Sequence, residues 1–86
     1  MKKHFTYIPT GVCSRQIDLD IEDGIIIDAA FVGGCSGNTQ GLCALIKKME
    51  VEEAIERLSG IKCGMKSTSC PDQLSKALIE FKNQNM

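Results

Sequence analysis

Hydrophobic and polar residues alternate along the first part of the chain. Ile17, Leu19 and Ile21 are separated by acidic residues, a pattern that predicts a strand with one buried face. A looser alternation precedes the turn residues Pro9, Thr10 and Gly11, and an apolar run follows Gly24. The predicted strands are therefore near 4–8, 15–22 and 25–32, the last two forming an antiparallel hairpin.

The register of this hairpin depends on the length of its turn. A three-residue turn over 22–24 places Leu19 opposite Ile27 and keeps the apolar side chains on one face, whereas a two-residue turn places Leu19 opposite Asp28. We therefore expect the three-residue turn. In that register Cys13 lies opposite Gly33, and Cys35 follows two residues later at the same end of the sheet.

Helical periodicity dominates the rest of the chain. Leu42, Leu45, Ile46 and Met49 recur at the spacing of one helical face, and two similar stripes follow. Cys43 lies beside the first stripe, and we interpret it as a core residue. The predicted helices are near 38–49, 51–59 and 71–83. Together the patterns predict an α+β fold of one domain over residues 1–86, a three-stranded antiparallel sheet with three helices packed on one face.

Composition narrows the classes of function. Ten basic and eleven acidic residues give a net charge of −1, and the few aromatic residues provide no platform for stacked bases, so no nucleic-acid partner is expected. No run approaches the ~20 apolar residues of a membrane span, and the N-terminus lacks the apolar core of a signal peptide. We expect a cytoplasmic protein without a membrane partner, whose five cysteines are metal ligands or reactive thiols rather than a disulfide framework.

Four cysteines lie in or beside turns and are candidate metal ligands. Pro71 suits the first position of the last helix, which would make Cys70 its N-cap, where the helix dipole favours the thiolate that binds metals. Cys35 stands just before another helix, and the remaining two lie in turns with Gly11 or Gly64. The predicted metal ligands are Cys13, Cys35, Cys63 and Cys70, with Zn²⁺ as the expected metal and an iron–sulfur cluster as the alternative.

The sequence also suits functions other than metal binding. Cys63 and Cys70, six residues apart, are also suited to cycling between dithiol and disulfide as a thiol relay. The glycine-rich loop 33–38 precedes a helix and would suit a phosphate, which leaves a nucleotide-binding accessory as a further alternative. His4 is expected to be an ordinary strand residue.

The stretch Thr68-Ser69-Cys70-Pro71-Asp72 spells the name of the TSCPD domain. Together with segments 10–14, 33–35 and 60–64, it resembles the small stand-alone four-cysteine proteins of that family, a domain also found at the C-terminus of cobalamin-dependent ribonucleotide reductases. The resemblance places the four family cysteines on Cys13, Cys35, Cys63 and Cys70.

The order of strands, helices and cysteines is also similar, more distantly, to NifU-type iron–sulfur scaffold proteins. On that comparison Cys13, Cys35 and Cys70 match the three scaffold thiols, whereas Arg15 and Ser69 replace the scaffold's Asp and His.

The resulting expectation is a metal-binding module with an accessory or structural role, linked to ribonucleotide reduction or iron–sulfur supply. Its expected partners are a metal ion and a ribonucleotide reductase or an iron–sulfur protein. Enzymatic activity of the chain alone is not expected. The resemblance associates that activity with a large reductase barrel, and 86 residues are too few to form one. The alternative is a thiol/disulfide relay or a nucleotide-binding accessory associated with ribonucleoside-diphosphate reductase.

Overall fold

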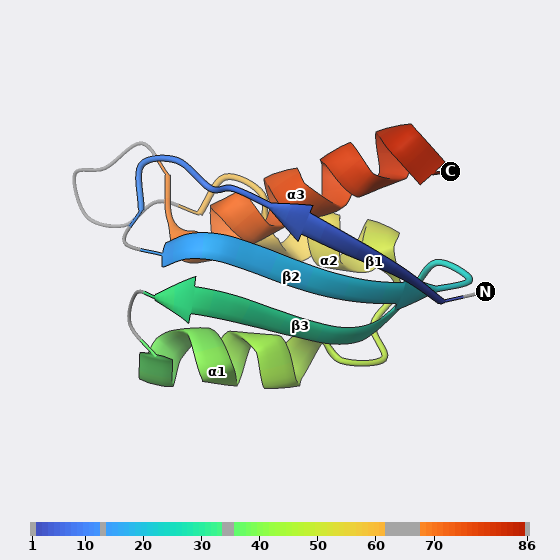
Figure 1. Ribbon diagram of the computed structural model, residues 1–86, viewed down its shortest axis with the longest axis horizontal. Coiled ribbons are helices and arrows are strands. Elements are labelled where there is room, and N and C mark those ends of the chain that lie inside the picture. The colour runs from blue at the N-terminus through green and yellow to red at the C-terminus, as the bar shows by residue number, and fades with distance from the viewer. Residues whose placement is uncertain (1, 13, 34–35, 62–67, 86) are drawn as a thin grey trace.

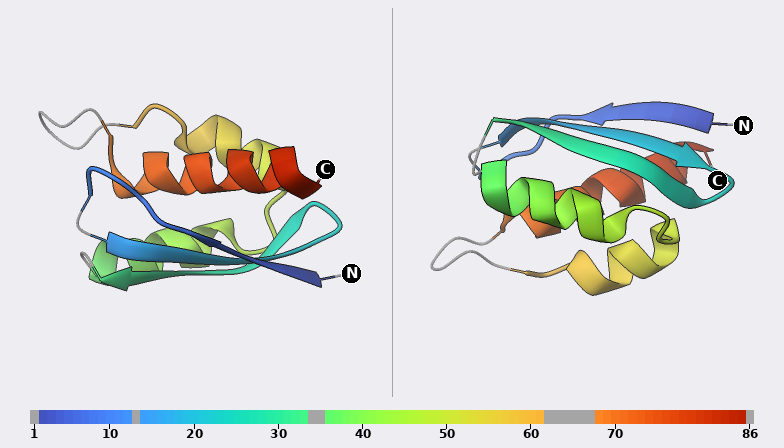
Figure 2. Two further views of the ribbon diagram at one scale, coloured as in Figure 1. Left: turned by 45° about the horizontal axis from the view of Figure 1, so that its top comes forward. Right: turned by 90° about the horizontal axis from the view of Figure 1, so that it is seen from below.

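The described part of the chain forms a three-stranded antiparallel sheet in the order β1-β2-β3, with three helices on one of its faces (Figures 1 and 2). The computed structural model describes residues 2–12, 14–33, 36–61 and 68–85. This arrangement confirms the α+β fold predicted from the sequence. The elements are β1 (Lys2–Tyr7), β2 (Ser14–Glu22), β3 (Ile25–Gly33), α1 (Ser36–Ile46), α2 (Val51–Leu58) and α3 (Cys70–Asn85).

The first helix ends earlier than predicted, at Ile46 rather than near residue 49. Lys48 adopts a positive φ of 70°, and its N–H donates to the carbonyl of Ile26 at 2.7 Å. The N–H of Ile26 in turn donates to the carbonyl of Met49 at 2.9 Å. The segment after α1 therefore leaves the helix because it pairs with the start of β3.

The β2–β3 hairpin has a two-residue turn, so the predicted three-residue turn is wrong. Glu22 pairs with Ile25, and both central residues, Asp23 and Gly24, have positive φ, 52° and 78°. Two-residue turns with this backbone match the twist of the flanking strands, and Asp-Gly is a favoured sequence for them. The local preference of the turn therefore determines the pairing at this end of the hairpin.

A β-bulge at Ile27 then restores the apolar face. The pairing along β3 passes from Ile26 to Asp28, which leaves Ile27 as the extra residue. Ile26 and Ala29 are buried, whereas Ile27 is 39 % exposed. As a result Leu19 pairs with Ala29 instead of Ile27 or Asp28.

A second irregularity shifts the far end of the hairpin. Gln16 pairs with Val32 and Ser14 pairs with Gly33, so Arg15 is the extra residue on β2. The predicted pairing of Cys13 with Gly33 is therefore wrong, because Ser14 takes that place. Cys13 itself lies outside the described residues.

The core lies between the sheet and the helices and is largely aliphatic. It contains residues from β2, β3 and all three helices, with the ring of Phe5 on β1 packing edge-on against Phe81 of α3. Its buried hydrophobic members are Ile17, Leu19, Ile21, Ile26, Ala29, Cys43, Ile46, Val51, Ala54, Leu58, Leu74, Ala77, Leu78 and Phe81.

The face that α1 buries differs from the predicted stripe. Thr39, Cys43 and Ile46 are buried, whereas Leu45 is 78 % exposed. The interpretation of Cys43 as a core residue is confirmed, and the inward placement of Leu45 is wrong. None of the helices in the described part of the chain is both long and apolar enough to cross a membrane.

Candidate functional site

The ends of four elements meet at one end of the molecule. β2, α1 and α3 begin there and β3 finishes there (Figure 1). The first helical residue of α3 is Cys70, one of the four predicted ligands. This end of the molecule is therefore the candidate site.

Ser69 is the N-cap of α3, which corrects the predicted cap at Cys70. The Ser69 hydroxyl accepts the N–H of Asp72 at 3.2 Å, and the Ser69 carbonyl accepts the N–H of Gln73 at 2.8 Å. Serine is preferred at this position because its short side-chain oxygen reaches the free N–H groups of the first turn. Cys70 and Pro71 are consequently the first two helical residues, and the thiol is held on the first turn.

A buried network of polar side chains ties other segments to the start of α3. The two carboxylate oxygens of Asp72 accept the N–H of Gly60 at 2.7 Å and the hydroxyl of Thr68 at 2.5 Å. The side-chain amide of Gln73 donates to the Thr68 hydroxyl at 2.9 Å and accepts the N–H of Thr10 at 3.0 Å. The turn after β1 and the end of α2 are thus both fixed to the helix that carries Cys70.

Two close contacts complete this arrangement. The hydroxyl of Ser69 donates to the carbonyl of Ile61 at 2.6 Å. Gly11 has a φ of 73°, and a Cβ there would lie 3.0 Å from the methyl carbon of Thr68. Glycine is required at position 11 both for its backbone conformation and for this close approach.

The charge of Asp72 is stabilised although its side chain is buried. The hydroxyl of Thr68 and then the N–H of Gly60 hold the pKa of the Asp72 carboxyl below its usual value, against the opposing effect of burial. Lys76, whose Nζ lies 4.0 Å from the carboxylate, favours the charged form further. The network is therefore anchored on a carboxylate whose hydrogen-bond donors are fixed in place.

The thiol of Cys70 lies beside β2. Its Sγ is 3.7 Å from the hydroxyl of Ser14, which is buried, while Cys70 is only partly buried. A partly exposed sulfur on the first turn of a helix is accessible to a metal ion or to another thiol. The role of Cys70 as a metal ligand stays a prediction.

Residues that precede or follow two other predicted ligands in the sequence lie at the same end of the molecule as Cys70. Cys13 directly precedes Ser14, and Cys35 follows Gly33 by two residues. Ser14 and Gly33 are register partners, and Ser14 contacts Cys70, so both strand ends lie at the end of the molecule where α3 begins. Cys13 and Cys35 are themselves outside the described residues.

The fourth predicted ligand, Cys63, is also outside the described residues. It follows Ile61 by two positions, and the carbonyl of Ile61 is bonded to Ser69, the residue before Cys70. Within the described ranges no three His, Cys, Asp or Glu side chains gather as a metal site. The structure thus fixes the position of Cys70 and of the segments that lead to the other three cysteines.

Cys43 and His4 are not part of this site. Burial raises the pKa of the Cys43 thiol to about 11, which keeps it protonated near neutral pH. His4 on β1 is exposed and hydrogen-bonded to Asp20 at 2.8 Å. The hydrogen bond that the Asp20 carboxylate accepts from His4 raises the pKa of His4, as expected of a surface ion pair.

The sequence prediction missed the polar residues that organise the site. Hydroxyl and amide side chains are common in turns, so the sequence alone does not distinguish Thr10, Thr68 and Gln73 from other turn residues. One signal was present, since Ser69 followed three residues later by the acidic Asp72 resembles a capping box.

A comparison with protein families identifies this chain. The model of the TSCPD domain matches residues 1–82. The chain belongs to the TSCPD domain family. The residues Thr68–Asp72, which spell the family name, are those that build the cap and the buried network at the start of α3. No curated protein and no solved structure matches the chain. The similarity to NifU-type scaffolds stays a prediction.

Proposed function

We propose that this TSCPD-domain protein is a metal-binding module whose ligands are Cys13, Cys35, Cys63 and Cys70. The observation that supports the proposal best is the fixed position of Cys70, whose thiol faces the start of β2 beside the hydroxyl of Ser14. The segments that lead to the other three cysteines end beside it. Four thiols from four segments would then converge where the fold brings the segments together.

The donor chemistry fits Zn²⁺ first and an iron–sulfur cluster second. Thiolates bind both, and four protein thiolates leave no open position for substrate, which is the arrangement of a structural zinc site. The bound metal would supply a cross-link between segments. Cys70 would provide its ligand from a helix start that the Asp72 network holds in place, as outer partners of metal ligands commonly do.

A structural metal also suits the size of the chain. A domain of 86 residues buries only about 60–65 % of its unfolded surface, so its core provides little excess stability. Closing four segments on one metal would add folding free energy at the end of the molecule where α1 and α3 begin. We propose an accessory role for this module, serving a ribonucleotide reductase or iron–sulfur supply.

Cobalt substitution tests the ligand set directly. Metal is removed from the protein under anaerobic conditions, and Co²⁺ is then added. The Co²⁺-bound protein should show the intense absorption of thiolate-to-cobalt charge transfer. Cys70→Ser should weaken Co²⁺ binding at least tenfold, because one of four ligands is replaced by a poor donor. Cys43→Ser is the matched control and should leave the spectrum unchanged, since Cys43 is buried between α1 and β3.

The thiol relay predicts a different outcome. It requires a reversible disulfide between Cys63 and Cys70, detectable by mass spectrometry after mild oxidation of the metal-free protein. A quantitative Cys63–Cys70 disulfide, together with no charge-transfer band on adding Co²⁺, would replace the metal-module proposal with the relay.

A further inference from the structure

The outer edge of β3 is paired along only part of its length. Residues 48–51 form an isolated antiparallel bridge with its beginning, where Lys48 donates to the carbonyl of Ile26 and Ile26 donates to that of Met49. Over positions 28–33 no strand among the described residues pairs with this edge. The chain thus adds a short extended segment to β3 and then leaves the rest of the edge open.

The open part of the edge has backbone groups that face away from β2. The N–H of Ala29 donates to the side chain of Asp28 at 2.9 Å, so it does not pair with β2. Because N–H and C=O groups alternate in direction along a strand, those of Phe31 also face outward. The carbonyl of Ala29 and both backbone groups of Phe31 therefore offer a hydrogen-bonding edge to an extended chain.

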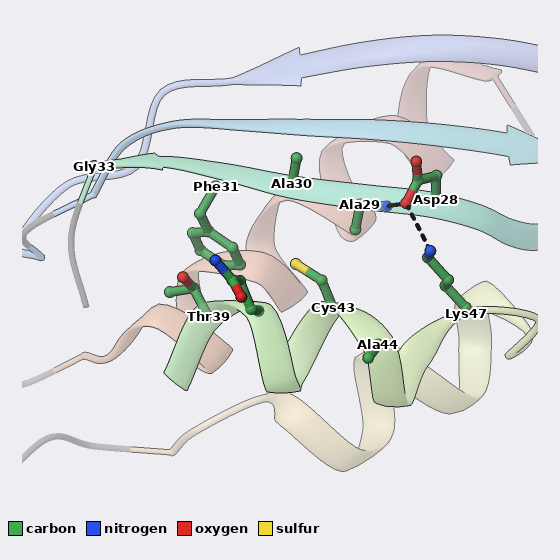
Figure 3. A pocket seen from close by; sticks show the side chains of 10 residues that line it. Asp28, Ala29, Ala30, Phe31, Gly33, Thr39, Cys43, Ala44 and Lys47 are labelled. Atoms are coloured by element: carbon green, nitrogen blue, oxygen red, sulfur yellow. Dashed lines mark hydrogen bonds and ion pairs between the residues drawn. The ribbon is translucent and has the colours of Figure 1, made fainter. Parts of the chain in front are cut away.

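A cavity of about 330 Å³ lies beside this edge, between β3 and α1 (Figure 3). The ring of Phe31 extends from β3 toward α1, and the thiol of Cys43 extends from α1 toward β3. Small side chains, Ala29 on β3 and Ala44 on α1, leave the space between them. The volume lies in the range of ligand pockets in proteins, and its wall is apolar enough for an aliphatic side chain.

The two ends of this groove differ in charge. Lys47, about half exposed, is 3.6 Å from Asp28 at one end. At the other end the exposed Arg15 lies against Gly33, where an added Cβ would be 3.3 Å from its Nε. The pair of Lys47 with Asp28 leaves its end of the groove without net charge, so an extended segment with an apolar residue and an acidic residue at the Arg15 end would match this distribution of charge.

We propose that the groove between β3 and α1 binds an extended peptide segment of a partner protein, with an acidic residue at the Arg15 end, by strand addition to residues 29–31. The backbone of Phe31 exchanges hydrogen bonds with the segment, and an apolar side chain of the segment enters the cavity beside Cys43. This site is independent of the proposed metal ligands.

A single strand fits this edge better than a second copy of the protein. α1 lies beyond the outer edge of β3 (Figure 1) and on the helical side of the sheet (Figure 2). A second copy that paired its β3 with this one around a two-fold axis would bring its own α1 into the same helical layer. A single extended segment carries no helix of its own, so it would contact only the groove.

The test selects binders from a displayed library of random short peptides and measures the selected peptides in solution. Enriched peptides should have an apolar residue with an acidic residue to one side of it, and binding should slow hydrogen exchange at the Phe31 amide. Ala44→Trp, which fills the groove from an exposed helix position, should weaken binding at least tenfold. Glu56→Trp on the exposed side of α2 is the matched control and should bind as the unchanged protein does.

Three outcomes would overturn the proposal. The first is no enrichment of peptides. The second is binding that neither protects the Phe31 amide nor responds to Ala44→Trp. The third is concentration-dependent self-association, seen by sedimentation, with the Phe31 amide protected when no peptide is present, which would assign the edge to a second copy.

Discussion

Replacing Asp72 with asparagine tests the network that positions Cys70. Asp72→Asn keeps the size of the side chain and leaves one oxygen to accept the N–H of Gly60. The amide nitrogen then faces the hydroxyl of Thr68, which loses its charged acceptor at 2.5 Å. Hydrogen bonds to charged groups contribute about 1.5–3 kcal/mol, and one is lost while the other is weakened, so we expect Asp72→Asn to lower the free energy of unfolding by about 2–3 kcal/mol.

Urea denaturation at pH 7 measures this loss as a lower midpoint with an unchanged slope. Glu56→Gln makes the same change from carboxylate to amide at an exposed position and should alter the free energy of unfolding by less than about 0.5 kcal/mol. In a double-mutant cycle, Thr68→Val and Asp72→Asn should be strongly non-additive, because they remove the same hydrogen bond.

The effect of Asp72→Asn should also depend on pH. The pKa of Asp72 is lower in the folded protein than its ordinary value of 3.8, so the unfolded chain binds the proton more readily. The stabilisation is therefore complete above that ordinary value and is lost as the pH falls through the folded pKa. The difference between Asp72→Asn and the unchanged protein should shrink in acid. Equal stability of the two proteins at pH 7, or a difference that stays constant down to pH 3, would refute the role assigned to Asp72.

Three further substitutions test individual parts of the account. Cys43→Ala should lower the free energy of unfolding by about 1 kcal/mol and leave metal binding unchanged; the Cys43 thiol, with its pKa raised to about 11, should be alkylated far more slowly at pH 8 in the folded than in the urea-unfolded protein. Gly11→Ala should cost about 1–2 kcal/mol in urea denaturation, because the positive φ and the contact with Thr68 both oppose a Cβ. Leu45→Lys should change stability by less than about 0.5 kcal/mol, since Leu45 is 78 % exposed; a larger loss would mean that α1 buries a different face.

The alternating pattern was sufficient to predict the sheet but not its register. Burial of Ile17, Leu19 and Ile21 follows from alternation alone. The turn, however, follows the local preference of Asp23-Gly24, and the bulge at Ile27 reconciles that turn with the buried face. A bulge has no strong local sequence signal, so both candidate registers omitted it.

The helical pattern left the orientation of α1 open for a similar reason. Leu45 and Cys43 lie on different faces, and the hydrophobic spacing favours the face with leucine. The structure buries Cys43 because α1 packs beside β3, where the small side chain of Ala29 points toward the helix. Which helical face is buried thus depends on the neighbouring element, which spacing within the helix does not specify.

The position of Cys70 could be predicted, whereas its supporting contacts could not. Pro71 and the polar residues before it indicate a helix start to within one residue. The hydrogen bond between the N–H of Thr10 and the side chain of Gln73 joins residues 63 positions apart, and no local pattern encodes it. Such long-range polar contacts become visible only when the fold brings turn and helix together.

The metal content of protein purified without oxygen tests the central proposal most directly. We predict about one Zn²⁺ per chain, or iron with the visible absorption of a cluster, retained in Cys43→Ser and lost in Cys70→Ser. A folded, monodisperse protein that contains far less than one metal per chain, and takes up none when Zn²⁺ or iron and sulfide are supplied, would contradict the proposed metal-binding function.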